Sequence, residues 1–73
     1  MYAVHQYNAN EDMGAISRHR TLETAVRAAR RRNVQHRKQY GAGSLVSFEA
    51  RHGDGSTVNP DVAENAARAA GLI

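Results

Sequence analysis

Cysteine is absent from this 73-residue chain. Without thiols the protein can form neither a disulfide framework nor a thiolate zinc site. A chain of this length makes one domain, residues 1–73, and buries only roughly 60 % of the surface that the unfolded chain exposes. Its stability must therefore come from packing or from self-association, and an elaborate active site is not expected.

The chain also has no long apolar run. No stretch approaches the ~20 apolar residues that span a bilayer. The N-terminal segment, MYAVHQYN, lacks the basic start and the apolar run of a signal peptide. We therefore expect a cytoplasmic protein that has no membrane partner.

Acidic residues are missing from the middle of the chain, where none occurs between Glu23 and Glu49. The net charge is +3 and the isoelectric point is about 10.0. Because the C-terminal third is close to neutral, the positive charge is regional. This distribution predicts acidic partners that meet one basic patch.

The segment from Thr21 to Tyr40 carries most of that charge, and its sequence predicts one long helix. Thr21 is a good N-cap, Glu23 lies in the first turn where the helix dipole favours a carboxylate, and Gly41 follows as a stop. At about 100° per residue, one side should face the core. That side contains Leu22, Ala25, Val26, Ala29, Asn33, His36 and Tyr40.

The basic residues of this helix occupy its other sides. Arg27, Arg31 and Lys38 should lie opposite the apolar stripe, and Arg30, Arg32 and Arg37 should flank it. Like charges four residues apart, such as Arg27 and Arg31, cost a few tenths of a kcal/mol. Two readings remain: a merely solvated face in an Arg-rich composition, or a contact surface in which Arg binds phosphate or carboxylate in a bidentate manner.

Two hairpins are predicted around the helix. The run from Tyr2 to Tyr7 is rich in strand formers, residues 8–14 contain turn formers, and residues 15–19 form a short second run. Residues 45–51 alternate between apolar and polar side chains, and a Gly53-Asp54-Gly55 turn could return residues 56–58 as a fourth strand.

The C-terminal segment predicts a short Ala-rich helix. Asn59 is a cap, Pro60 suits the first helical position, and Gly71 closes the helix. Leu72 and Ile73 form an apolar tail that either packs back on the domain or joins a second copy, so a homodimer through this helix and tail is one expectation.

The predicted fold is therefore α+β: a small antiparallel sheet of two hairpins in ββαββα order, with the basic helix on one face. The residues expected to face that helix are Val4, Ile16, Val46 and Phe48. Those expected on the other face are His5, Tyr7, Ser17, His19, Ser47, Glu49 and Arg51.

No set of side chains predicts catalysis, a metal or a cofactor. The four histidines lack ligand spacing, although His5 and His19 as cross-strand neighbours could form a weak metal site. The acidic segment 8–12 does not match the spacing of a calcium loop. Residues 52–55 are explained as a turn between two strands. Residues 41–44 link a helix to a strand, which is the reverse of the order that a phosphate-binding loop needs. We expect a protein that is not an enzyme.

The favoured function is nucleic-acid binding through the basic helix. The expected contact residues are Arg18, Arg20, Arg27, Arg30, Arg31, Arg37 and Lys38. Base readout would need Asn33, Gln35 or Gln39, and with three tyrosines and one phenylalanine, stacking on single strands has little support. The alternative is a small protein whose arginines dock on an acidic surface of a protein or nucleoprotein machine.

The segment GAISRHRTLETAVRAARRR followed by LVSFEARHGDGSTV resembles small bacterial and phage domains of hairpin–helix–hairpin architecture. Those domains include phage-encoded anti-CRISPR inhibitors. The resemblance spans Tyr2 to Val58 and consists of architecture and a TLETAVRAA helix start, so it transfers no functional residue. The Ala-rich C-terminal helix departs from the simplest pattern. The resemblance implies an inhibitor that binds a CRISPR surveillance complex and interferes with its binding of target DNA.

Overall fold

The computed structural model describes residues 1–72 and contains an antiparallel sheet and two helices. Ile73, which the sequence placed in an apolar tail, lies outside the described residues. The elements follow the order β1 (Tyr2–Asn8), β2 (Glu11–His19), α1 (Leu22–Tyr40), β3 (Val46–His52) and α2 (Pro60–Ala69).

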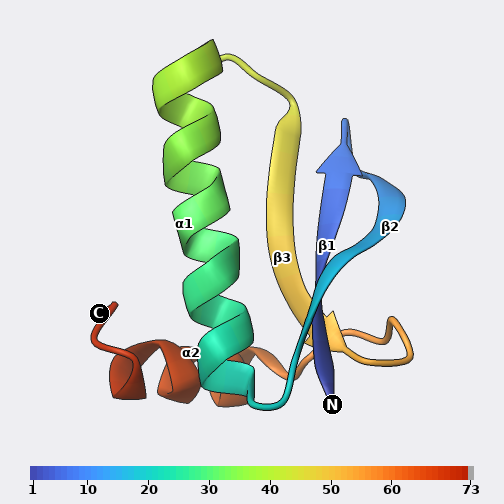
Figure 1. Ribbon diagram of the computed structural model, residues 1–73, viewed down its shortest axis with the longest axis vertical. Helices are drawn as coiled ribbons and strands as arrows, with labels where there is room; N and C mark the ends of the chain where they lie inside the picture. The colour runs from blue at the N-terminus through green and yellow to red at the C-terminus, as the bar shows by residue number, and fades with distance from the viewer. Residues whose placement is uncertain (73) are drawn as a thin grey trace.

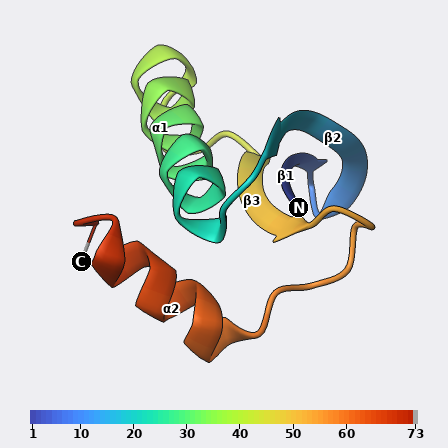
Figure 2. The same cartoon turned by 60° about the horizontal axis from the view of Figure 1, so that its bottom comes forward.

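The sheet has the strand order β2-β1-β3, so the first strand is central and both partners are antiparallel to it. The helix α1 packs along one face of the sheet, while α2 lies across the N-terminal end of α1 (Figure 1). Viewed from that end, β2 and β3 curve around β1 (Figure 2). The expected α+β class is confirmed.

The turn between β1 and β2 is shorter than the sequence predicted. Ala9 and Asn10 have φ of 51° and 69°, which closes the hairpin in two residues. Residues 11–14, expected to form the turn, therefore continue β2, with Glu11 opposite Asn8 and Asp12 opposite Tyr7. The expected turn at residues 8–14 was wrong because two left-handed residues suffice to reverse the chain.

The register of this hairpin also changes which face several residues occupy. Ser17 pairs with Val4 and His19 pairs with Tyr2, so both lie on the α1 side of the sheet. The register then shifts, leaving Ile16 without a cross-strand partner and 37 % exposed. The expected facing of Ser17 and His19 was wrong, and Ile16 is not part of the buried core, because a short alternating run does not fix its own register.

No fourth strand forms within residues 1–72. After β3 the chain turns at Gly55, whose amide donates to the carbonyl of His52, and only an isolated bridge joins Arg51 to Thr57. Val58 then leaves the sheet and is buried beside Leu22 and Ala66. The predicted second hairpin, and with it the ββαββα order, was wrong because α2 begins at Pro60 and draws the chain onto the N-terminal end of α1.

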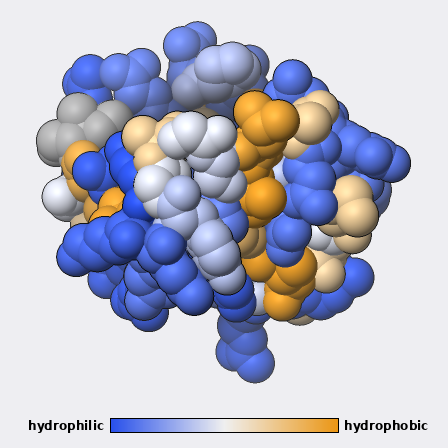
Figure 3. All heavy atoms as spheres, turned by 90° about the horizontal axis from the view of Figure 1, so that it is seen from above, coloured by the Kyte–Doolittle hydropathy of each residue, from blue (hydrophilic) through white to orange (hydrophobic). Residues whose placement is uncertain are grey.

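The core is thin and is built mainly from small residues. On the α1 side of the sheet Val4 packs against Ala25 and Ala29, with Phe48 and Ala50 at the margin. Val4 is the largest side chain that is fully buried. Most of the surface at the end where α1 finishes is hydrophilic, broken by a narrow apolar band (Figure 3). No helix in residues 1–72 has the length and apolar character needed to cross a bilayer.

Asn33 joins α1 to the free edge of β3. Its side-chain nitrogen donates to the carbonyl of Phe48 at 2.9 Å, and the Phe48 amide donates back to its side-chain oxygen at 2.9 Å. One side chain therefore pairs both outward-pointing backbone groups of Phe48, as a neighbouring strand would. This explains why an amide lies within the apolar stripe of the helix.

We expect Asn33→Ala to lower the free energy of unfolding by about 1–2 kcal/mol, because it leaves the Phe48 amide and carbonyl without partners. Urea denaturation followed by circular dichroism measures the change. Gln35→Ala, at an exposed position of the same helix, is the matched control and should leave the free energy of unfolding unchanged. Equal stabilities for the two variants would show that the Asn33 bridge contributes little.

Candidate functional site

The cations of α1 have no acidic partner among residues 1–72. All six basic side chains between Arg27 and Lys38 are exposed. Among residues 1–72 the ion pairs are His5–Asp12, Glu49–Arg51 and Glu64–Arg68, and none of them includes a cation of α1. The positive field of the helix is therefore not neutralised by the described part of the chain.

These cations form two rows on the helix. At about 100° per residue, Arg27, Arg31 and Lys38 point away from the sheet; we call them the outer row. Arg30 and Arg37 lie nearer the sheet and line a groove, and we call them the groove row. Arg32 falls on the opposite flank of α1.

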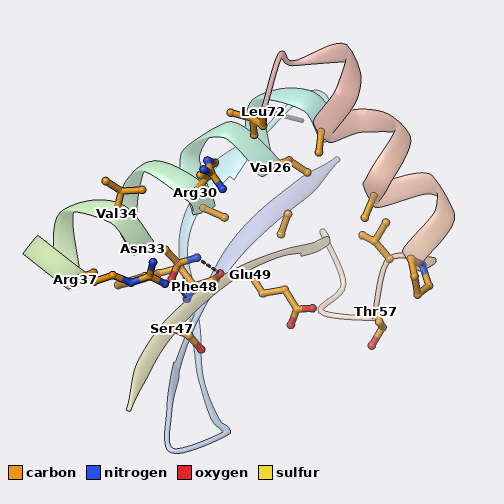
Figure 4. A pocket seen from close by; sticks show the side chains of 16 residues that line it. Val26, Arg30, Asn33, Val34, Arg37, Ser47, Phe48, Glu49, Thr57 and Leu72 are labelled. Carbon is orange, nitrogen blue, oxygen red and sulfur yellow. Dashed lines mark hydrogen bonds between the residues drawn. The ribbon is translucent and has the colours of Figure 1, made fainter. Parts of the chain in front are cut away.

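The groove lies between α1, the edge strand β3 and α2, and has a volume of about 680 Å³ (Figure 4). Apolar side chains from all three parts line it. They include Val26 and Val34 from α1, Phe48 from β3, and Val58, Ala63 and Leu72 from the C-terminal segment. Leu72 thus packs back towards the domain, which is one of the two arrangements expected for the tail.

Charge is distributed unevenly around this groove. The groove row supplies positive charge along the α1 wall, whereas Glu49 stands on β3 towards Thr57 (Figure 4). Glu49 accepts a hydrogen bond from the Arg51 guanidinium at 3.4 Å, so its charge already has a partner. The unbalanced charge of the groove is therefore positive and lies along α1.

The remaining predicted contact residues are placed differently. Arg27 donates a hydrogen bond to the carbonyl of Ala70 at 3.2 Å and so helps to attach α2 to α1. Arg18 pairs with Ala3, whose side chain lies on the sheet face turned away from α1, so the sheet separates Arg18 from the helix rows. Arg20 is exposed in the turn before α1.

The side chains considered for base readout differ in their surroundings. The Asn33 amide is engaged by β3, whereas Gln35 and Gln39 are exposed. Tyr40 is 64 % exposed and its ring contacts His36, with centroids 4.5 Å apart. His36 in turn forms a 2.6 Å hydrogen bond with Ser44, which ties the end of α1 to the segment before β3.

A second polar cluster lies on the sheet face turned away from α1. His5 is only 8 % exposed, and its Nδ1 donates to the Asp12 carboxylate at 2.9 Å. That hydrogen bond, followed by one from the Gly14 amide, lowers the pKa of Asp12 below its ordinary value. Burial raises the pKa of Tyr7, whose ring lies 5.1 Å from the guanidinium of Arg51. This face of the sheet is therefore partly covered by its own side chains.

The His5–Asp12 hydrogen bond joins β1 to β2. Within residues 1–72 no hydroxyl group is hydrogen-bonded to His5. His19 lies on the other sheet face, so it does not join His5 in a metal site. Residues 1–72 hold no group of three or more His, Cys, Asp or Glu side chains placed to share a metal ion.

Comparisons with protein-family models, curated proteins and solved structures found no match to this chain. The resemblance to phage hairpin–helix–hairpin domains therefore stays a hypothesis.

The sequence predicts the exposed cations of α1 but does not predict the groove. The available signals were Val34, an apolar residue among the cations of α1 that is 39 % exposed, and Asn33 within the buried stripe. Neither signal locates the opposite wall, because residues of α2 and Leu72 reach the groove only through tertiary packing.

We expect Arg27→Ala to lower the free energy of unfolding by about 0.5–1 kcal/mol, since it removes the hydrogen bond to Ala70. Amide hydrogen exchange should show faster exchange confined mainly to α2. Arg31→Ala is the matched control, because it removes an arginine of the same row that has no such bond. Unchanged exchange in α2 would contradict a structural role for Arg27.

We expect the pairing of Asp12 with His5 to stabilise the fold at neutral pH and to lose that effect in acid. The folded-state pKa of Asp12 lies below its ordinary value of about 3.9, so the stabilisation is present above that value and disappears as the pH falls through the folded pKa. The difference in thermal midpoint between the wild type and Asp12→Asn should therefore shrink from about pH 7 to about pH 3. Glu11→Gln controls for the loss of an exposed carboxylate, and a difference independent of pH would refute the assignment.

Proposed function

We propose that the protein is a non-enzymatic module that binds the phosphate backbone of nucleic acid through the basic surface of α1. The observation that carries this proposal is the set of exposed cations on α1 that have no ion pair within residues 1–72. Arg31 and Lys38 in the outer row and Arg30 and Arg37 in the groove row are the principal contacts. Arg27 contributes charge while it holds α2.

Folding alone does not favour this arrangement of charge. Arg27 and Arg31 lie four residues apart, and such like-charge pairs cost a few tenths of a kcal/mol in the folded helix. A polyanion converts that repulsion into attraction, and each phosphate contact also releases condensed counterions. The planar guanidinium group suits bidentate contact with phosphate oxygens.

The binding we propose is independent of base sequence. Asn33, one of the three amides considered for base readout, already pairs with Phe48, and Arg18 lies across the sheet from the helix rows. Contacts from α1 therefore reach phosphates, which position a protein on nucleic acid without specifying a sequence.

The same cations would also suit an acidic protein surface. This is the reading in which the protein is a phage or mobile-element inhibitor that docks on a host machine and blocks its nucleic-acid binding, as the anti-CRISPR-like resemblance implies. Both readings place the contact on α1 and differ in the partner, so a single set of measurements separates them.

With about four phosphate contacts, affinity for a DNA duplex should fall by about two orders of magnitude between about 50 and about 200 mM salt. Fluorescence anisotropy with a labelled oligonucleotide measures this slope. We expect Arg31→Glu combined with Lys38→Glu to weaken binding at least about tenfold. Thermal stability should stay unchanged or rise, because glutamate at position 31 relieves its repulsion with Arg27.

Arg18→Glu combined with Arg20→Glu is the matched control, because it changes the net charge by the same amount away from α1. A weak dependence of affinity on salt, or an equal loss of affinity in the two double variants, would contradict the proposal that α1 binds nucleic acid. A capture from lysate that survives nuclease and depends on Arg31 and Lys38 would favour the acidic protein surface over nucleic acid.

A further inference from the structure

The groove between α1, β3 and α2 has a composition different from that of the basic surface beside it. Its floor and walls are largely apolar, and the volume of about 680 Å³ is open to solvent. Val34 remains 39 % exposed at its rim. An apolar groove open to solvent in so small a domain is typical of a recognition surface.

The edge of β3 limits how a partner can enter. A strand added to that edge would need the outward-pointing amide and carbonyl of Phe48. Both groups are already paired with the side chain of Asn33 (Figure 4). An added strand would have to displace these two hydrogen bonds, which favours a helix that docks through its side chains.

The wall opposite α1 is suited to a helix. Ala63 and Ala67 lie one turn apart on α2 and line the groove, so that wall presents small side chains. Small residues allow a second helix to approach closely, and Phe48 and Val58 offer apolar contact at the floor. A helix lying beside α1 would meet these small side chains where α2 crosses the N-terminal end of α1 (Figure 1).

The charges of the groove specify the partner further. Arg30 and Arg37 are seven residues apart on α1, which is about 10 Å along the helix axis. Neither side chain forms a hydrogen bond or an ion pair in residues 1–72. A second helix lying beside α1 has the same rise per residue, so its own positions seven apart fall opposite these two arginines.

We propose that this groove binds an amphipathic helix of a partner protein, with an apolar stripe directed into the groove and two acidic residues seven positions apart facing Arg30 and Arg37. Charge complementarity along α1 selects this occupant. A second copy of the chain fits less well, since the acidic residues of α2, Asp61 and Glu64, are only three positions apart.

This inference goes beyond the proposed function and can fail separately from it. The helix partner depends on the groove row and on the apolar walls. The proposed nucleic-acid contact shares Arg30 and Arg37 with this partner, but it also uses Arg31 and Lys38 of the outer row, which do not line the groove.

The test uses the full chain and three fluorescein-labelled peptides whose helical form is fixed by a hydrocarbon staple. The first carries leucines at i, i+3, i+4 and i+7 and glutamates seven apart beside that stripe. The second has lysines in place of the glutamates, and the third keeps the glutamates but distributes the leucines around the helix. We expect saturable binding of the first peptide, measured by anisotropy, and at least about fivefold weaker binding of the other two.

Paired variants locate the site. Arg30→Ala with Arg37→Ala should weaken the first peptide about fivefold, whereas Arg31→Ala with Lys38→Ala, which removes the same charge, should change its affinity less than about twofold. Ala67→Phe, which fills the groove from α2, should abolish binding without lowering the thermal midpoint. Circular dichroism checks that each variant is folded.

The remaining outcomes overturn the inference. They are absence of binding by the first peptide, equal affinity for all three peptides, equal losses in the two arginine-row variants, or unchanged binding by folded Ala67→Phe. A concentration-dependent dimer in sedimentation analysis that Ala67→Phe disrupts would assign the groove to a second copy of this chain instead.

Discussion

The close contact of α1 with the sheet, made by Ala25 and Ala29 against Val4, is the constraint on which the rest of the structure depends. Because these residues are small, the helix lies close to the sheet and buries only a narrow stripe. The wider sides of α1 remain in solvent and carry its cations. A thin core and an exposed basic surface are therefore two results of the same packing.

Asn33 fixes where along the sheet α1 makes that contact. Apolar packing alone would allow the helix to slide along the sheet, whereas the paired hydrogen bonds to Phe48 fix one position of α1 along β3. The same bonds close the edge of β3 at this residue. They place the groove row beside an apolar floor and favour side-chain docking as the mode of entry.

The two sheet faces differ in what they contribute. The face towards α1 holds the apolar contacts, while the other face buries His5 and Tyr7 in a cluster with Asp12 and Arg51. A hydrogen bond from His5 to Asp12 joins β1 to β2 on that face. The exposed cations lie along α1, and the apolar groove lies between α1, β3 and α2.

Local sequence determined the elements whose signals are contained within a few residues. The cap at Thr21, the alternation in β3 and the Asn59-Pro60 start of α2 lie within single segments, and the structure confirms them. It also confirms the start of the apolar stripe of α1, where Leu22, Ala25 and Ala29 are buried. The expected burial of Tyr40 at the end of that stripe was wrong, because this last residue of α1 is 64 % exposed. The exposure of the α1 cations was likewise readable from helical periodicity. Periodicity did not predict the hydrogen bond from Arg27 to the carbonyl of Ala70. Nor did it predict that Arg18 lies on the sheet face turned away from α1.

Tertiary structure decided the features that depend on how segments meet. The two-residue turn at Ala9 and Asn10 set the register of β2, and burial of Val58 beside Leu22 prevented a fourth strand. The groove exists only because α2 returns across the end of α1 and brings Leu72 towards Val26. Periodicity within a segment comes from its own backbone geometry, whereas register and enclosure come from contacts between residues far apart in the chain, which no local pattern encodes.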